Sequence, residues 1–85
     1  MIESMKIVAN VCRKNGWTLI NPLPDYAYIT CRSCPNRVTI DINEKGDIEI
    51  INYFQSQVIW RDEIEWPYDV ELASIIYEMM NEEGY

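Results

Sequence analysis

Apolar side chains recur every three to four residues over residues 2–14, which is the spacing of one face of an α-helix. At about 100° per residue, one broad side of that helix is apolar, and Glu3, Lys6 and Arg13 lie on the opposite side. Gly16 follows, and glycine readily adopts the left-handed backbone conformation that is common just after a helix. The pattern therefore predicts an N-terminal helix that ends near Gly16. Its apolar positions are Ile2, Met5, Ile7, Val8, Ala9, Val11 and Cys12.

The middle of the chain alternates between apolar and polar positions, which is typical of half-buried β-strands. The alternation is strict over residues 37–42, whose apolar members are expected to face a core. Two prolines make residues 21–25 a turn, and residues 43–47 form a hairpin loop with a glycine. The predicted strands lie at 17–21, 26–31, 37–42 and 47–54, and residues 58–60 are either a bent continuation of the last strand or a short extra strand.

A second helix is predicted over residues 67–83. Pro67 suits the first helical turn, Asp69 lies near the positive end of the helix dipole, and Gly84 ends the helix. Its apolar arc spans about 200°, roughly twice the arc that a helix needs to cover a sheet. The helix is therefore either wedged between the sheet and the first helix, or buried in part against another chain. The arc comprises Tyr68, Val70, Leu72, Ala73, Ile75, Ile76, Tyr77, Met79 and Met80.

These elements predict one domain of the α+β class across the 85 residues, with an N-terminal helix, a three- to four-stranded antiparallel meander and a C-terminal helix. Both helices are expected on one face of the sheet, which leaves the other face to polar side chains such as Asp41, Asp47 and Glu49. No apolar run approaches the roughly 20 residues that a membrane span needs, and the N-terminus lacks the pattern of a signal peptide. With three cysteines, an odd number, we expect reduced thiols and a cytoplasmic location.

Charge is distributed unevenly along the chain, whose net charge is −7. Residues 1–61 carry all seven basic side chains and six acids, whereas residues 62–85 carry eight acids and no base. Nucleic acid is bound through basic patches that release counterions, so an acidic segment of this kind opposes direct binding to nucleic acid. A protein with a basic surface is the expected partner instead. The alternative is that the acids only keep a small protein soluble.

The stretch WRDEIEWPYDVE, residues 60–71, combines three large aromatics with five carboxylates. Trp and Tyr are favoured at protein interfaces, and charges mainly select the partner and speed the encounter. We therefore expect Trp60 and Trp66 to anchor a partner next to an acidic surface. The alternative is that the aromatics attach this segment to the core and the acids form its solvated rim. The acids of the predicted surface are Asp62, Glu63, Glu65, Asp69, Glu71, Glu78 and Glu82.

Cys31 and Cys34 have the spacing that zinc knuckles use at a turn between strands. Structural zinc takes four ligands, and the chain has no histidine and one further cysteine, Cys12. A zinc site within one chain would need Cys12 and a carboxylate as well, whereas two chains could each supply the pair at a dimer axis. In thioredoxin-type pairs, a helix N-terminus lowers the pKa of the reactive thiol. Here the two cysteines lead into a predicted strand, so that feature is missing and a redox role has less support, although Arg32 and Arg37 would favour a thiolate. The structural alternative makes Cys31 an inward strand residue and Cys34 a turn residue.

Catalysis has little support in the sequence, and we expect a protein without enzymatic activity. The absence of histidine removes the usual general base near neutral pH and any Ser-His or Cys-His pair. The three glycines stand alone at positions 16, 46 and 84, so there is no glycine-rich phosphate loop. No cofactor is expected apart from zinc in the two-chain alternative.

In length, acidity and element order, the whole chain resembles the small acidic proteins with which bacteriophages inhibit host defence, including anti-CRISPR proteins. Some of those combine an N-terminal helix, a short antiparallel sheet and a C-terminal helix with a carboxylate surface that imitates DNA. The resemblance implies an inhibitor that occupies the basic nucleic-acid site of a host protein in the host cytoplasm. The pair Cys31 and Cys34 is a departure, because that mode of action does not require it.

Three functions are consistent with the sequence. The first is a non-enzymatic inhibitor that covers a cationic surface of a larger host protein. The second is a homodimer with a structural or regulatory role, joined through the C-terminal helix or by zinc at Cys31 and Cys34. The third is an immunity or antitoxin-like protein, which would use the same acidic surface against a basic toxin.

Overall fold

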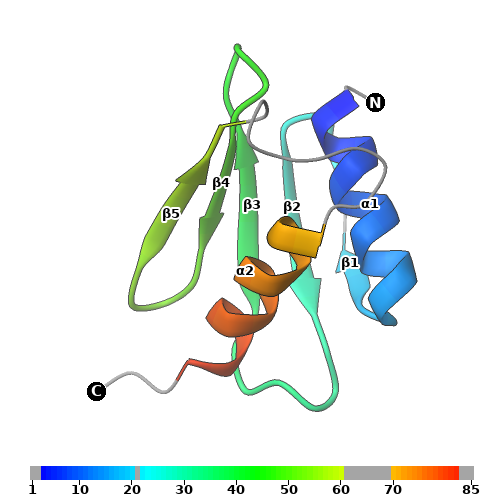
Figure 1. Ribbon diagram of the computed structural model, residues 1–85, viewed down its shortest axis with the longest axis vertical. Helices are drawn as coiled ribbons and strands as arrows, with labels where there is room; N and C mark the ends of the chain where they lie inside the picture. The colour runs from blue at the N-terminus through cyan, green and yellow to red at the C-terminus, as the bar shows by residue number, and fades with distance from the viewer. Residues whose placement is uncertain (1–2, 21, 61–69, 83–85) are drawn as a thin grey trace.

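The computed structural model describes residues 3–20, 22–60 and 70–82. Along this described part of the chain, a helix, five strands and a second helix follow one another (Figure 1). The elements are α1 (Glu3–Asn15), β1 (Thr18–Ile20), β2 (Tyr26–Thr30), β3 (Val38–Ile42), β4 (Ile48–Ile51), β5 (Ser56–Ile59) and α2 (Val70–Asn81).

The predicted N-terminal helix is confirmed as α1, whose apolar side faces the core. Met5, Val8 and Cys12 are almost fully buried. Gly16 ends the helix with a φ of 71°, a left-handed conformation that costs little only for glycine. The backbone amide of Trp17 then donates a hydrogen bond to the carbonyl of Cys12 at 2.9 Å, which satisfies one of the last free carbonyls of the helix.

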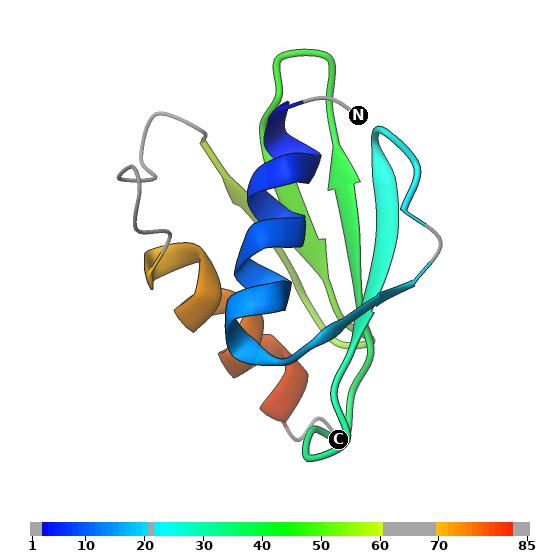
Figure 2. The same cartoon turned by 90° about the vertical axis from the view of Figure 1, so that its right-hand side faces the viewer.

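Both helices lie on the same face of the sheet (Figure 2). α1 contacts β1 and α2, and α2 also contacts β3 and β4. This arrangement confirms the predicted α+β class and the predicted placement of the helices. The described sheet has five strands rather than the three or four predicted, because residues 18–20 and 56–59 both pair into it.

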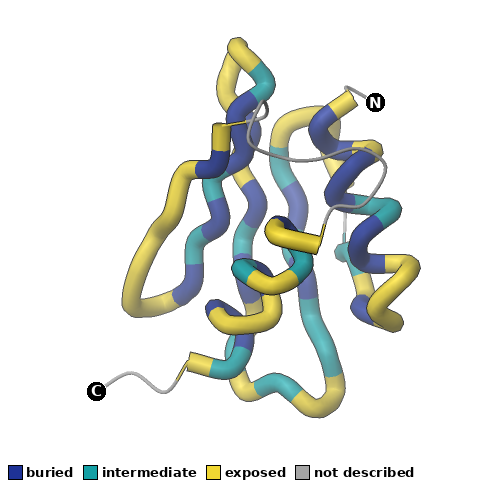
Figure 3. The backbone as a smooth tube through the Cα atoms, in the orientation of Figure 1, coloured by how far each residue is buried: buried dark blue, intermediate teal, exposed yellow. Residues whose placement is uncertain are grey.

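The strands form one antiparallel sheet in the order β1-β2-β3-β4-β5. Buried residues alternate with more exposed ones along the central strands, because successive side chains point to opposite faces (Figure 3). The register aligns Ala27 with Ile40 and Ile40 with Ile50, and all three are buried beneath the helices. The alternation predicted for residues 37–42 is therefore confirmed.

The strand predicted over residues 47–54 is too long, because the chain turns at Asn52. The backbone amide of Asn52 donates to the carbonyl of Gln55 at 2.9 Å. Its buried side-chain oxygen accepts hydrogen bonds from the amides of Phe54 and Gln55, both at 2.8 Å. Its amide nitrogen donates to the carbonyl of Met79 in α2 at 2.9 Å. The chain reverses here, so β5 is a short extra strand and not a bent continuation of β4.

The C-terminal helix is described from Val70 onward, and it buries less than its full apolar arc. Leu72, Ile76 and Met80 are fully buried, as expected for a helix that packs against both the sheet and α1. Val70 and Tyr77, in contrast, are 68% and 54% exposed. The first alternative, a helix wedged in the fold, therefore explains most of the arc and leaves two apolar side chains in solvent. Neither described helix has the length and apolar character that crossing a membrane requires.

Candidate partner-binding surface

The face of the sheet opposite the helices, its outer face, has no described helix or strand covering it (Figure 2). One row of side chains crosses this face from β2 to β5, because the register sets them directly beside one another. The row combines an aromatic, two carboxylates and an apolar side chain. In order across the sheet, its residues are Tyr26, Asp41, Glu49 and Val58.

Asp41 and Glu49 face each other directly across β3 and β4. Side chains in such positions have Cβ atoms about 5 Å apart, and like charges there destabilise a sheet. Within residues 3–20, 22–60 and 70–82, no basic side chain forms an ion pair with either carboxylate. The described structure thus holds two negative charges together without neutralising them. A cation supplied from outside would relieve their repulsion.

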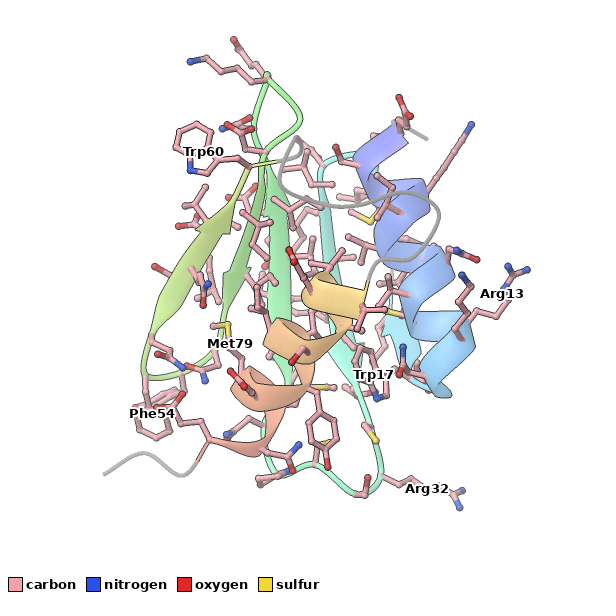
Figure 4. The ribbon with its side chains drawn as sticks, viewed as in Figure 1. Arg13, Trp17, Arg32, Phe54, Trp60 and Met79 are labelled. Atoms are coloured by element: carbon pink, nitrogen blue, oxygen red, sulfur yellow. The ribbon has the colours of Figure 1, made fainter. Side chains whose placement is uncertain are left out.

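Trp60 follows β5 and points outward near the β3–β4 hairpin (Figure 4). Its side chain is 55% exposed, and it lines a hollow of about 380 Å³ together with Asn43, Glu44, Lys45 and Asp47. Val58 lies two residues earlier, on the same outer face, and is 46% exposed. Exposed apolar area therefore adjoins the facing carboxylates. We call Asp41, Glu44, Glu49, Val58 and Trp60 the acidic–aromatic surface.

The hairpin beneath this surface is held in place by Asn43. The side-chain oxygen of Asn43 accepts hydrogen bonds from the amides of Lys45 at 2.9 Å and Asp47 at 3.0 Å, and its nitrogen donates to the Asp47 carboxylate at 3.1 Å. Gly46 has a φ of 88°, and its carbonyl accepts a 2.6 Å hydrogen bond from the Ser4 hydroxyl of α1. Asp47 is largely buried in this network, and it lines a hollow together with Asp41 and Glu49, as predicted for the acids of the outer face. A preorganised hairpin loses little entropy when a partner binds.

The other end of the outer face is aromatic and carries a cation. The Arg37 guanidinium lies 4.4 Å from the centre of the Tyr28 ring. The hydroxyl of Tyr26 donates to that of Tyr28 at 2.8 Å, and this hydrogen bond raises the pKa of Tyr26. Tyr53 and Phe54 meet edge to face at 5.0 Å and, with Arg37, line a hollow of about 440 Å³. Arg37 places a positive charge at this end, and Lys45 of the β3–β4 hairpin, which also lines the hollow beside Trp60, places one next to the acidic–aromatic surface.

The predicted site residues fall into three groups. Trp60 belongs to the acidic–aromatic surface. Three acids, Glu71, Glu78 and Glu82, are exposed on α2 or directly after it, and α2 covers the inner face, so they lie apart from the carboxylates of the outer face. The remaining predicted residues, Asp62, Glu63, Glu65, Trp66 and Asp69, lie outside the described residues.

The cysteines are free thiols, of which Cys31 and Cys34 lie in the turn after β2. Cys12 is buried in the core, and burial raises the pKa of its thiol to about 12. Across the described residues, no three His, Cys, Asp or Glu side chains gather so that they could hold a metal ion. Cys31 and Cys34 therefore lack a third ligand from the described part of their own chain, and the two-chain zinc site stays a prediction.

The outer-face residues Asp41, Glu49 and Val58 are not among the sequence-predicted site residues. Alternation places both acids on the outer face, and a hairpin loop centred near residue 45 sets them opposite each other, so the signal was available in the sequence. Their facing carboxylates can bind a cation, and the neighbouring Trp60 can cover the apolar stem of a basic side chain. Comparison with protein-family models, with curated proteins and with solved structures finds no match for this chain.

Proposed function

We propose that the protein is a non-enzymatic binding protein whose acidic–aromatic surface engages a cationic surface of a larger protein. The observation that supports this proposal is the facing pair of Asp41 and Glu49, which has no ion pair with a basic side chain of the described residues and lies beside exposed Val58 and Trp60. A basic side chain of the partner would lie between the two carboxylates. If the partner uses its basic surface to bind nucleic acid, this protein would inhibit it.

Charged and apolar contacts would contribute differently to binding. A partner arginine that meets both carboxylates forms charge-assisted hydrogen bonds and also removes their mutual repulsion. Trp60 would supply affinity, since a buried tryptophan at an interface is often worth about 2 kcal/mol or more. The charges would mainly raise the association rate and select basic partners. Binding should therefore weaken with salt, because the Debye length falls from about 10 Å at 0.1 M to about 3 Å at 1 M.

Capture of partners from a lysate of the source cell tests the proposal with two charge-matched variants. D41N/E49Q neutralises two carboxylates on the outer face, and E71Q/E78Q neutralises two on α2. We expect wild type and E71Q/E78Q to recover a protein with a basic surface, and D41N/E49Q to lose it. An equal loss in both variants would mean that net charge alone matters, and it would reject a site on the outer face.

The acidic stretch after Trp60 needs a separate variant, because its residues follow the surface in sequence. Asp62, Glu63 and Glu65 all become lysine in this variant, which reverses the charge predicted to attract the partner. We expect the captured protein to be lost. Undiminished capture would exclude an electrostatic contribution from these three acids and would leave Asp41 and Glu49 as the site.

A homodimer joined through α2 is a second candidate. Val70 and Tyr77 are 68% and 54% exposed, and seven residues make nearly two helical turns, so both lie on one side of the helix. Native mass spectrometry at micromolar concentration tests this candidate together with zinc content. A dimer that dissociates in Val70→Ser/Tyr77→Ser would support it, and a metal-free monomer would exclude it.

A further inference from the structure

The turn after β2 brings two cysteines together, away from the acidic–aromatic surface. The backbone amide of Cys34 donates to the carbonyl of Cys31 at 3.2 Å. Residues joined in this way close a β-turn whose first and last Cα atoms are less than about 7 Å apart. A disulfide needs Cα atoms about 4.4–6.8 Å apart. The turn therefore holds the two cysteines at a separation that a disulfide can bridge with little movement of the backbone.

The two sulfurs also share one hydrogen-bonding partner. The Ser33 hydroxyl lies 3.1 Å from the sulfur of Cys31 and 3.9 Å from the sulfur of Cys34. Both side chains therefore point toward the same small region, as the formation of a bond between them requires.

The two thiols differ in how readily they ionise. Hydrogen bonds from the hydroxyl and the backbone amide of Ser33 lower the pKa of Cys31, because they stabilise the thiolate. Burial raises the pKa of Cys34, and the neighbouring Cys31 thiol raises it further. Arg32 points away from the molecule (Figure 4), and Arg37 lies over a tyrosine ring. Ser33, rather than the arginines named from the sequence, therefore favours the thiolate of Cys31.

The C-terminal end of α2 supports the turn. The amide nitrogen of Asn81 lies 3.6 Å from the sulfur of Cys34. The backbone amide of Asn36 donates to the carbonyl of Met80 at 3.1 Å, and its side-chain amide donates to the carbonyl of Glu82. These contacts hold the turn, and Cys34 in particular, against the end of α2. The relative position of the two cysteines is therefore supported by a helix as well as by the turn itself.

We propose that Cys31 and Cys34 form a thiol–disulfide exchange site whose reactant is a small-molecule disulfide such as glutathione disulfide. The Cys31 thiolate attacks one sulfur of the reactant, which forms a mixed disulfide and releases one reactant thiolate. Cys34 then loses its proton to solvent and attacks the Cys31 sulfur, which forms the intramolecular disulfide and releases the second thiolate. The two cysteines lose two electrons and two protons, and the reactant gains them as two thiols. This site is independent of the proposed partner binding.

The sequence offers a direct assay, because trypsin cuts after Arg32, between the two cysteines. The native protein is incubated with glutathione disulfide, unfolded in the presence of an alkylating reagent, digested and analysed by mass spectrometry. A disulfide between Cys31 and Cys34 joins peptides 15–32 and 33–37, and reduction separates them. Cys12 lies in peptide 7–13 and is buried, so glutathione on that peptide would report unfolding.

We expect the wild-type protein to lose two hydrogens and to retain no glutathione. Cys34→Ser should accumulate one glutathione on Cys31, because no second thiol removes it, and Cys31→Ser should leave Cys34 largely unmodified over the same time. Ser33→Ala keeps both thiols and should slow the first step.

Two results for the wild-type protein would overturn the proposal, and neither depends on the folding of a variant. One is stable glutathione on both cysteines of the turn. The other is no reaction at either cysteine under conditions in which the urea-unfolded chain reacts. A folded Cys34→Ser variant that reacts no faster than Cys31→Ser would also overturn it, since Cys31 would then not be the attacking thiol.

Discussion

Glu49→Gln removes one of two facing carboxylates, and we expect this variant to be more stable than the wild type while binding its partner less well. Asp41 and Glu49 are direct partners in the register, a position in which opposite charges gain about 0.2–1 kcal/mol and like charges destabilise the sheet. Coulomb's law gives a similar value, since two unit charges about 6 Å apart in water repel each other by roughly 0.7 kcal/mol. Glutamine keeps the size of the side chain. The free energy of unfolding should therefore rise by about 0.5 kcal/mol, which corresponds to about 2–4 °C in Tm for a domain of this size.

Urea unfolding followed by tryptophan fluorescence measures this change, because Trp17 is buried in the native fold and becomes exposed on unfolding. Glu44→Gln is the matched control, since it removes the same charge from an exposed hairpin position that has no register partner. The gain in Glu49→Gln should shrink in about 1 M salt, where charges are screened within about 3 Å. If Glu49→Gln were no more stable than Glu44→Gln at low salt, the two carboxylates would not repel each other, and the main reason to expect a cation between them would be lost.

Three other positions carry further predictions. Asn52→Ala should lower the free energy of unfolding by about 2–3 kcal/mol, because three backbone groups lose their hydrogen-bonding partner; unchanged stability in urea would contradict this role. Gly16→Ala should cost about 1 kcal/mol from its φ of 71° alone, since a Cβ there meets nothing within 4 Å, and calorimetry would detect the lower Tm. The pKa of Cys12 is about 12 in the fold against 9.0 without burial. The unfolded chain therefore ionises first, so stability should be complete below pH 9 and fall by up to roughly 1.4 kcal/mol per pH unit up to pH 12. Cys12→Ala should remove that part of the decline, and parallel pH curves for the two proteins would refute it.

The period of apolar positions was enough to predict α1, the central strands and the face that the helices cover. It succeeds because burial acts on each element separately, so that Ile40 must be apolar whichever strand lies beside it. It fails at Asn52, whose hydrogen-bonding partners lie in α2 and in the following turn. Hydrogen bonds between residues far apart in the sequence do not produce a periodic pattern of apolar positions, so the pattern cannot predict them. The number of strands was underestimated partly for this reason.

The candidate surface was predictable in part. Composition singled out Trp60, and alternation with the hairpin loop would set Asp41 opposite Glu49. The difference between Cys31 and Cys34 was not predictable, because it depends on where one serine hydroxyl points and on which thiol packs against α2. Side-chain orientation and tertiary burial decide both, and neither is encoded in the spacing of two cysteines.

The central claim is that the acidic–aromatic surface binds cationic side chains of a partner. An NMR titration of isotope-labelled protein with a short arginine-rich peptide tests this claim without knowledge of the partner. We predict that the amide signals of Asp41, Glu49 and Val58 and the indole signal of Trp60 shift together in wild type, and that these shifts are lost in D41N/E49Q. Signals that move only along α2, or that move equally in wild type and D41N/E49Q, would contradict the claim.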